Sequence, residues 1–150
     1  MATLLKKILL IEDSQTDSFL IQRAMREYPA LTSHSLIIHN DMKSAQDYLN
    51  MNRDSISLIL LDLGLPDTTD GKDTYRQLSL SNTTNIPVIV LTSTNNRNMA
   101  MDLINLGLKD FLCKTDVMHA PLLLPQAIDF ILSRNVHKLR SVRNMIGDSA

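Results

Sequence analysis

The fold is decided by the stretch Leu58-Ile59-Leu60-Leu61-Asp62, an apolar run that ends in a carboxylate. A run that is apolar on both faces is typical of a central strand in a parallel sheet. Three other strand-like runs also end in polar residues: 7–11 before Glu12 and Asp13, 87–91 before Thr92, and 110–113 before Lys114. Because the carboxyl ends of parallel strands lie along one edge of a sheet, we expect these polar side chains to converge.

Length and composition indicate one globular domain. The chain has 150 residues, of which 44% are hydrophobic and 21% charged, and this is enough for a hydrophobic core. A net charge of −1 gives no field that would attract nucleic acid or a membrane surface. The single cysteine, Cys113, excludes an internal disulfide framework and is typical of a reducing compartment. No run reaches the ~18 apolar residues of a membrane span, so we expect a cytoplasmic protein with no membrane and no nucleic acid as partner.

Strand and helix patterns alternate five times along the chain. Strands are predicted at 7–11, 35–39, 57–62, 86–92 and 110–114, and helices at 14–28, 42–49, 71–80, 96–106 and from 121 or 125 to 146. Gly107 is expected to end the fourth helix, as glycine often does. Five such units predict an α/β fold, a doubly wound five-stranded parallel sheet with five helices and right-handed crossovers.

The polar residues at the carboxyl edge predict a metal site beside a phosphoryl site. Three carboxylates cannot crowd together without a positive partner, and hard oxygen ligands without paired histidines favour Mg²⁺ over a transition metal. The hydroxyl of Thr92 and the ammonium of Lys114 then remain, and both groups suit a phosphoryl oxygen.

These residues together resemble the receiver domain of two-component response regulators, of the chemotaxis-regulator type. The resemblance covers residues 6–134 and rests on the pair Glu12-Asp13, on Asp62, on Thr92 followed by the small Ser93, and on Phe111 three residues before Lys114. It implies the flavodoxin-like strand order 2-1-3-4-5. It also implies that Asp62 accepts a phosphoryl group from a histidine kinase, a histidine phosphotransfer protein or a small phosphodonor.

The resemblance assigns metal ligands on two strands. Asp13, Asp62 and the backbone carbonyl of Gly64 would hold Mg²⁺, and Glu12 would reach the ion through water. Such a partly hydrated octahedron is what Mg²⁺ prefers.

The resemblance also assigns the phosphate-binding and switch residues. Thr92, Ser93 and Lys114 would bind the phosphoryl group. After transfer, Thr92 would draw its loop inward and Phe111 would move into the vacated space, which makes Thr92 and Phe111 the switch pair.

Two departures from the family pattern concern loops beside the site. Thr115 follows Lys114 where the family usually has proline, so we expect the chain beyond Lys114 to run differently. One extra residue lies between Pro66 and Gly71, in the loop that flanks the predicted metal.

The C-terminal helix carries an apolar seam with alternating spacings of four and three. Its members are Ile128, Leu132, Asn135, Leu139, Val142 and Ile146. We expect a receiver domain over 1–134 and, over 135–150, an extension of the helix that acts as a coiled coil or linker. The extension predicts a homodimer through this helix, or a helix that continues into a downstream output domain of a longer protein.

The predicted function is that of a phospho-acceptor receiver in a phosphorelay, not of an enzyme. Two alternatives remain open: a Mg²⁺-dependent phosphohydrolase that forms an aspartyl phosphate, and a receiver-fold interaction module that works without phosphorylation. The hydrolase usually needs a second aspartate two residues after the nucleophile, where this chain has Gly64. The complete set of site residues argues against the interaction module.

Overall fold

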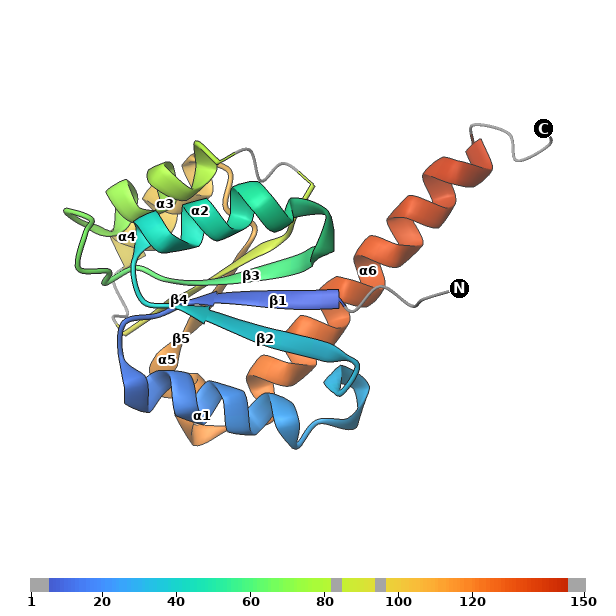
Figure 1. Cartoon of the computed structure of the whole chain (residues 1–150), viewed down its shortest axis with the longest axis horizontal. Helices are drawn as coiled ribbons and strands as arrows, with labels where there is room; N and C mark the ends of the chain where they lie inside the picture. Colours follow the sequence, from blue (N-terminus) through green and yellow to red (C-terminus); the bar gives the residue numbers. More distant parts are fainter. Residues whose placement is uncertain (1–5, 82–84, 94–96, 146–150) are drawn as a thin grey trace.

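Five parallel strands form one sheet with helices on both faces (Figure 1). The computed structural model describes residues 6–81, 85–93 and 97–145, with side chains as far as residue 134. The strands are β1 (Lys6–Ile11), β2 (His34–His39), β3 (Ile56–Asp62), β4 (Val88–Thr92) and β5 (Asp110–Cys113). The helices are α1 (Gln15–Arg26), α2 (Met42–Asn52), α3 (Gly71–Ser79), α4 (Arg97–Asn105), α5 (Lys114–His119) and α6 (Leu123–Met145), with 3-10 turns at Pro29–Leu31 and Arg53–Ser55.

The strand order is β2-β1-β3-β4-β5, which confirms the predicted flavodoxin-like topology. Every neighbouring pair is parallel, and β3 lies between β1 and β4. Alternate residues of β3 point to opposite faces of the sheet. Leu58 and Leu60 pack in a cluster with residues of α1 and α6, whereas Ile59 and Leu61 pack in a second cluster with residues of α2, α3 and α4. This double burial explains why the strand is apolar without alternation.

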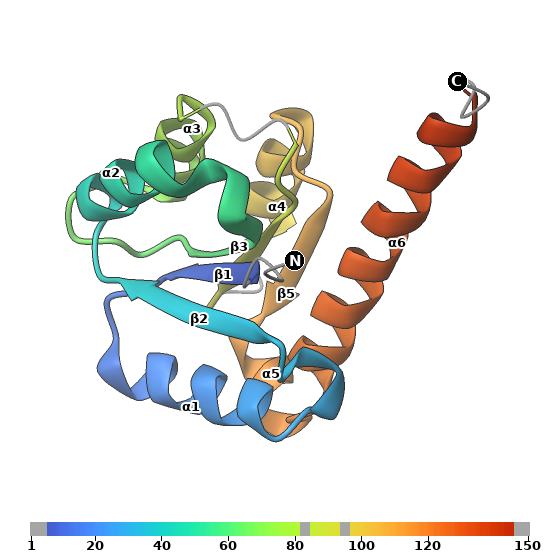
Figure 2. The same cartoon turned by 45° about the vertical axis from the view of Figure 1, so that its right-hand side comes forward.

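The helices form two layers, one on each face of the sheet. Helices α2, α3 and α4 cover one face, and α1, α5 and the first part of α6 cover the other, as the two views agree (Figures 1 and 2). Both layers leave the carboxyl edge of the strands accessible, which is the edge where ligands bind in open α/β sheets.

Side-chain caps fix where three helices begin. Ser14, Asp41 and Asp70 each accept a hydrogen bond from the backbone N–H three residues further on, and this satisfies one of the unpaired donors at a helix start. At the other end of α4, Gly107 has a φ of 107°, a left-handed conformation that glycine adopts without strain. The predicted helix end at Gly107 is therefore confirmed.

The prediction of five helices is wrong by one, because a short helix follows β5. Lys114 was expected at the end of the last strand, but it is the first residue of α5. Asp116 lies in the first turn of α5, and a negative charge at the start of a helix favours the helix. Strand β4 also begins two residues later than predicted, at Val88, because Pro87 has no N–H for the ladder.

Helix α6 begins against the sheet and then projects past the end of the domain (Figure 2). Ile128 is fully buried and Leu132 packs against the same cluster, as expected of the first half of this helix. The seam residues from Asn135 onward lie outside the side chains that the structure describes, so the seam stays a prediction. Within the described ranges, no helix is both long and apolar enough to cross a membrane.

Candidate metal and phosphoryl site

Three carboxylates from two neighbouring strands meet at the carboxyl edge of the sheet. Glu12 and Asp13 follow β1, and Asp62 is the last residue of β3. One ligand oxygen from each of the three lies within 4.8 Å of the others. Glu12 and Asp62 are buried, whereas Asp13 is exposed. The convergence predicted from the strand ends is therefore present.

Lys114 reaches this cluster from the first turn of α5. Its Nζ donates to Glu12 Oε1 at 2.6 Å and lies 3.2 Å from Asp62 Oδ1. Burial alone would lower the pKa of Lys114, but its hydrogen bonds to carboxylates and the charge of Asp62 raise it well above the ordinary value. The lysine is thus a permanent positive charge at the site, although it comes from a helix and not from the strand.

The two buried carboxyl groups differ in their affinity for a proton. Burial, followed by contact with Asp62, raises the pKa of Glu12 to about 8 in spite of the neighbouring Lys114. Burial would also raise the pKa of Asp62, but Glu12, Lys114 and the backbone N–H of Gly64 together lower it below the ordinary value. Asp62 is therefore the carboxylate that this environment keeps ionised.

The donor set fits a divalent cation. Glu12 Oε2 is buried and has no hydrogen-bond partner among the described residues, a condition that is costly without a ligand or an ion. All three side chains offer hard oxygen atoms, and an exposed residue on one side leaves room for water ligands. Glu12, Asp13 and Asp62 could thus hold the ion.

Asp17 belongs to the site but was not predicted from the sequence. It lies in the first turn of α1, and its Oδ2 accepts a hydrogen bond from Lys114 Nζ at 2.9 Å. The signal was present in the sequence: Ser14 caps the helix, and an acidic residue three positions later lies on the first turn, near the ends of the strands.

Thr92, Ser93 and Phe111 lie on the side of β4 and β5. Thr92 is the buried last residue of β4, and it pairs in register with Cys113 at the end of β5. Ser93 follows it and is exposed. Phe111 is half-buried and packs against the cluster between the sheet and α2 to α4. The neighbouring strand ends bring the hydroxyl of Thr92 to the same edge as Asp62.

The loop between β3 and α3 is held by the carboxylate of Asp67. This group accepts hydrogen bonds from the backbone N–H groups of Met42 and Lys43, at 2.9 and 3.0 Å. Further along, the hydroxyl of Thr74 donates to the carbonyl of Leu63 at 2.9 Å. The loop with the extra residue is therefore tied to the start of α2 and leaves Gly64 exposed beside Asp62.

Fold and site together define a receiver domain. The response regulator receiver domain family matches residues 8–120, and the chain belongs to this family. The response regulator Rcp1 of Synechocystis sp. is 34% identical over 116 residues, which are 73% of this chain and 77% of Rcp1. The two-component response regulator ORR1 of Oryza sativa subsp. japonica is 27% identical over 112 residues, 72% of this chain and 48% of ORR1.

Solved structures of receivers have the same fold. The Mn²⁺-bound form of response regulator Rcp1 has a TM-score of 0.65 and 31% identity, and the match covers 78% of this chain and 89% of the Rcp1 chain. The phosphorylated cyanobacterial phytochrome response regulator RcpA has a TM-score of 0.69 and 28% identity, and the match covers 83% of this chain and 91% of the RcpA chain. The chain is thus a receiver domain of a two-component system, and neither the phosphohydrolase nor the phosphorylation-independent module is favoured.

Proposed function

We propose that Asp62 accepts a phosphoryl group from a histidine kinase or a histidine phosphotransfer protein, and that the protein acts in a cytoplasmic phosphorelay. The observation that carries the proposal is the cluster of Glu12, Asp13 and Asp62 with Lys114 at the carboxyl edge of the sheet. The similarity to the phosphorylated RcpA supports it.

The ion of this site is proposed to be Mg²⁺. Asp13, Asp62 and the carbonyl of Gly64 would bind it directly and Glu12 through water. The similar Rcp1 binds Mn²⁺, an ion that takes the same hard oxygen ligands. When bound, the ion neutralises charge on the acceptor and on the incoming phosphoryl oxygens.

The side chains supply a nucleophile and charge in fixed places. An oxygen of Asp62 attacks phosphorus while the bond from phosphorus to the donor breaks and the donor keeps that electron pair. Lys114 donates to an oxygen of the transferred group, whose charge is spread over three positions. Positioning and electrostatic stabilisation account for the chemistry, and no group has to act as a general acid within this chain. We therefore propose that the protein acts as a phospho-acceptor and not as an enzyme.

The readout of phosphorylation is proposed to pass through β4 and β5. Thr92 and Ser93 would donate hydrogen bonds to the phosphoryl group, and the inward movement of Thr92 would leave space for Phe111. Phe111 is half-buried, so a change in its packing alters the surface beside α4. The added charge would in this way shift the equilibrium between two arrangements of Thr92 and Phe111. The surface that binds a partner would change with that arrangement.

Phosphorylation in vitro tests the proposal. Incubation of the protein with acetyl phosphate and Mg²⁺ is expected to add one phosphoryl group, observed by intact mass, and a chelator is expected to prevent the addition. If no adduct forms with Mg²⁺, or if the chelator leaves the yield unchanged, the proposed chemistry is wrong.

A change of Asp13 tests the metal site separately from the nucleophile. Asp13→Asn removes one charge from the ligand set, so the affinity for Mg²⁺ measured by calorimetry is expected to fall about tenfold or more. Raised Mg²⁺ should then recover part of the phosphorylation. Asp47→Asn, an exposed aspartate on α2, is the matched control and should bind Mg²⁺ as the wild type does. An unchanged affinity in Asp13→Asn would mean that the ion binds elsewhere.

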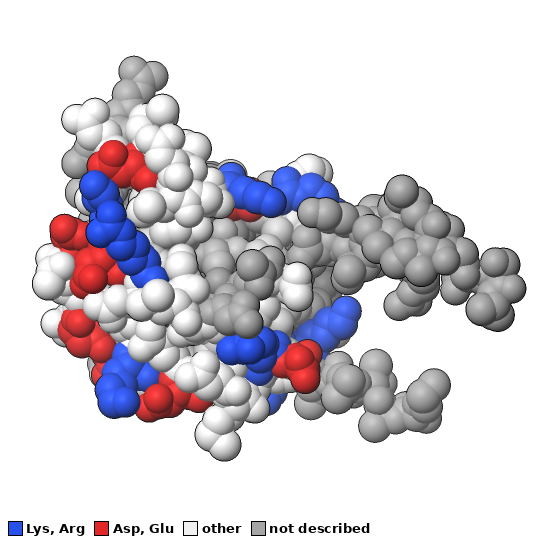
Figure 3. Space-filling view, turned by 90° about the horizontal axis from the view of Figure 1, so that it is seen from above, with Lys and Arg blue, Asp and Glu red and all other residues white. Residues whose placement is uncertain are grey.

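The partners are proposed from charge and from the C-terminal helix. Lysine, arginine and acidic side chains are interspersed over the face of α2 to α4 (Figure 3), a mixture that suits a protein partner. The net charge of −1 favours a protein partner over nucleic acid or a membrane.

A homodimer through residues 135–150, or a downstream output domain in a longer protein, is proposed from the sequence seam alone. Sedimentation of the wild type against Leu139→Glu tests the dimer: a wild type that is monomeric at high concentration contradicts it.

A further inference from the structure

Three carboxyl groups surround the Lys114 ammonium, which donates hydrogen bonds to Glu12 and Asp17 and forms an ion pair with Asp62. Around Nζ lie Glu12 Oε1 at 2.6 Å, Asp17 Oδ2 at 2.9 Å and Asp62 Oδ1 at 3.2 Å. An ammonium group has three N–H donors and no more. A phosphoryl oxygen that contacts Lys114 therefore competes with these carboxyl groups for the ammonium.

Burial decides which carboxylate is replaced. The side chain of Glu12 is 1% exposed and that of Asp62 is 9% exposed, whereas that of Asp17 is 30% exposed. Glu12 Oε1 would remain in the interior without its hydrogen bond from Lys114, which is costly, and Asp62 carries the phosphoryl group itself. Water can solvate Asp17 in place of Lys114. The N-terminus of α1 also favours a negative charge in its first turn, so Asp17 leaves Lys114 at the lowest cost of the three.

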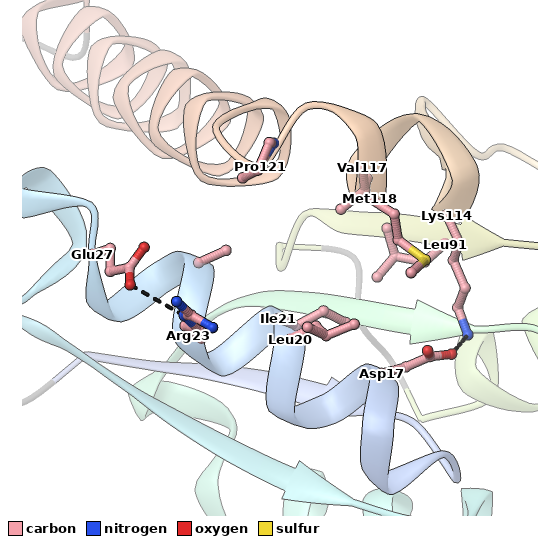
Figure 4. A pocket seen from close by; sticks show the side chains of 11 residues that line it. Asp17, Leu20, Ile21, Arg23, Glu27, Leu91, Lys114, Val117, Met118 and Pro121 are labelled. Carbon is pink, nitrogen blue, oxygen red and sulfur yellow. Dashed lines mark hydrogen bonds and ion pairs between the residues drawn. The ribbon is translucent and has the colours of Figure 1, made fainter.

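The surroundings of the pair allow this movement. Asp17 and Lys114 lie at one end of a cavity of about 270 Å³ between α1 and α5, and Figure 4 shows them joined across it. The walls are mainly apolar and include Ile21, Val117 and Met118. Because the space beside the pair is open, the Asp17 side chain can turn away without displacing packed atoms.

We propose that Asp17 is a positioning residue that holds Lys114 before phosphorylation and competes with the phosphoryl group for it. This inference rests on the proposed function, in which Lys114 contacts the phosphoryl group. Asp17 keeps the lysine ordered at the edge of the site and weakens the binding of the phosphoryl group. The ion pair also joins α1 to α5, and its exchange for a phosphoryl contact removes this link.

The test is the affinity for beryllofluoride, a mimic of the bound phosphoryl group, measured with saturating Mg²⁺ by fluorine NMR. Asp17→Asn removes the competing charge, and the dissociation constant is expected to fall about two- to fivefold, as the strength of a partly exposed ion pair implies. Asp17→Glu restores a competing carboxylate and is expected to return the constant toward that of the wild type.

Glu27→Gln is the matched control. Glu27 is on the same side of the domain and lines the same cavity, but it pairs with Arg23. A similar tightening in Glu27→Gln would indicate a general field effect and overturn the role of Asp17. Unchanged or weaker binding in Asp17→Asn would also overturn it. If the wild type does not bind beryllofluoride at all, both the proposed function and this inference are wrong. If the wild type binds it and the dissociation constant of Asp17→Asn is unchanged, only this inference is wrong.

Discussion

Asp62→Asn is expected to abolish phosphorylation by acetyl phosphate. The carboxylate of Asp62 is buried at the end of β3, beside Lys114, and its pKa is held below the ordinary value. An amide of the same shape has no anionic oxygen to attack phosphorus. Intact mass should show no phosphoryl adduct under conditions that modify the wild type completely.

The matched control for this variant is Asp54→Asn. Asp54 is exposed and lies just before β3, at the opposite end of the same strand. It should become phosphorylated as the wild type does. An adduct in Asp62→Asn at the wild-type yield would show that another group is the acceptor, and peptide mapping would then locate it.

The sequence was sufficient to predict the strands that position the site. The central run before Asp62 has apolar residues at every position because both faces of β3 are covered, whereas a strand with one face in water would alternate apolar and polar residues. The position of Asp62 relative to Glu12 then follows from topology, since adjacent parallel strands end at one edge. Gly107 was informative for a different reason, because its positive φ is a conformation that most side chains avoid.

The sequence was not sufficient for the elements that depend on tertiary contacts. Helix α5 has six residues, too few for a periodic pattern to be distinct from a strand end followed by a loop. The partner of Asp17 could not be predicted, because an ion pair between residues 97 positions apart depends on how α1 and α5 pack. Asp67 is a similar case, since its hydrogen bonds to the start of α2 require the final path of the loop.

Leu60→Ala is expected to cause the largest loss of stability among the variants considered. Leu60 is fully buried in β3 and packs in the cluster that joins the sheet to α1 and α6. Truncation removes buried methyl groups and leaves a cavity between layers that cannot collapse fully. Substitutions of this kind cost about 2–5 kcal/mol. Urea unfolding followed by far-UV circular dichroism measures the change in the free energy of unfolding.

Leu80→Ala is the matched control, because it makes the same truncation at an exposed leucine. Leu80 follows α3 and is 83% exposed, so the same truncation should change the free energy of unfolding by no more than about 0.5 kcal/mol. Equal losses in the two variants would contradict the arrangement of layers around β3. Leu60 lies two residues before Asp62 on the same strand. The packing around Leu60 that stabilises the domain therefore also fixes the acceptor carboxylate of Asp62 at the edge of the sheet.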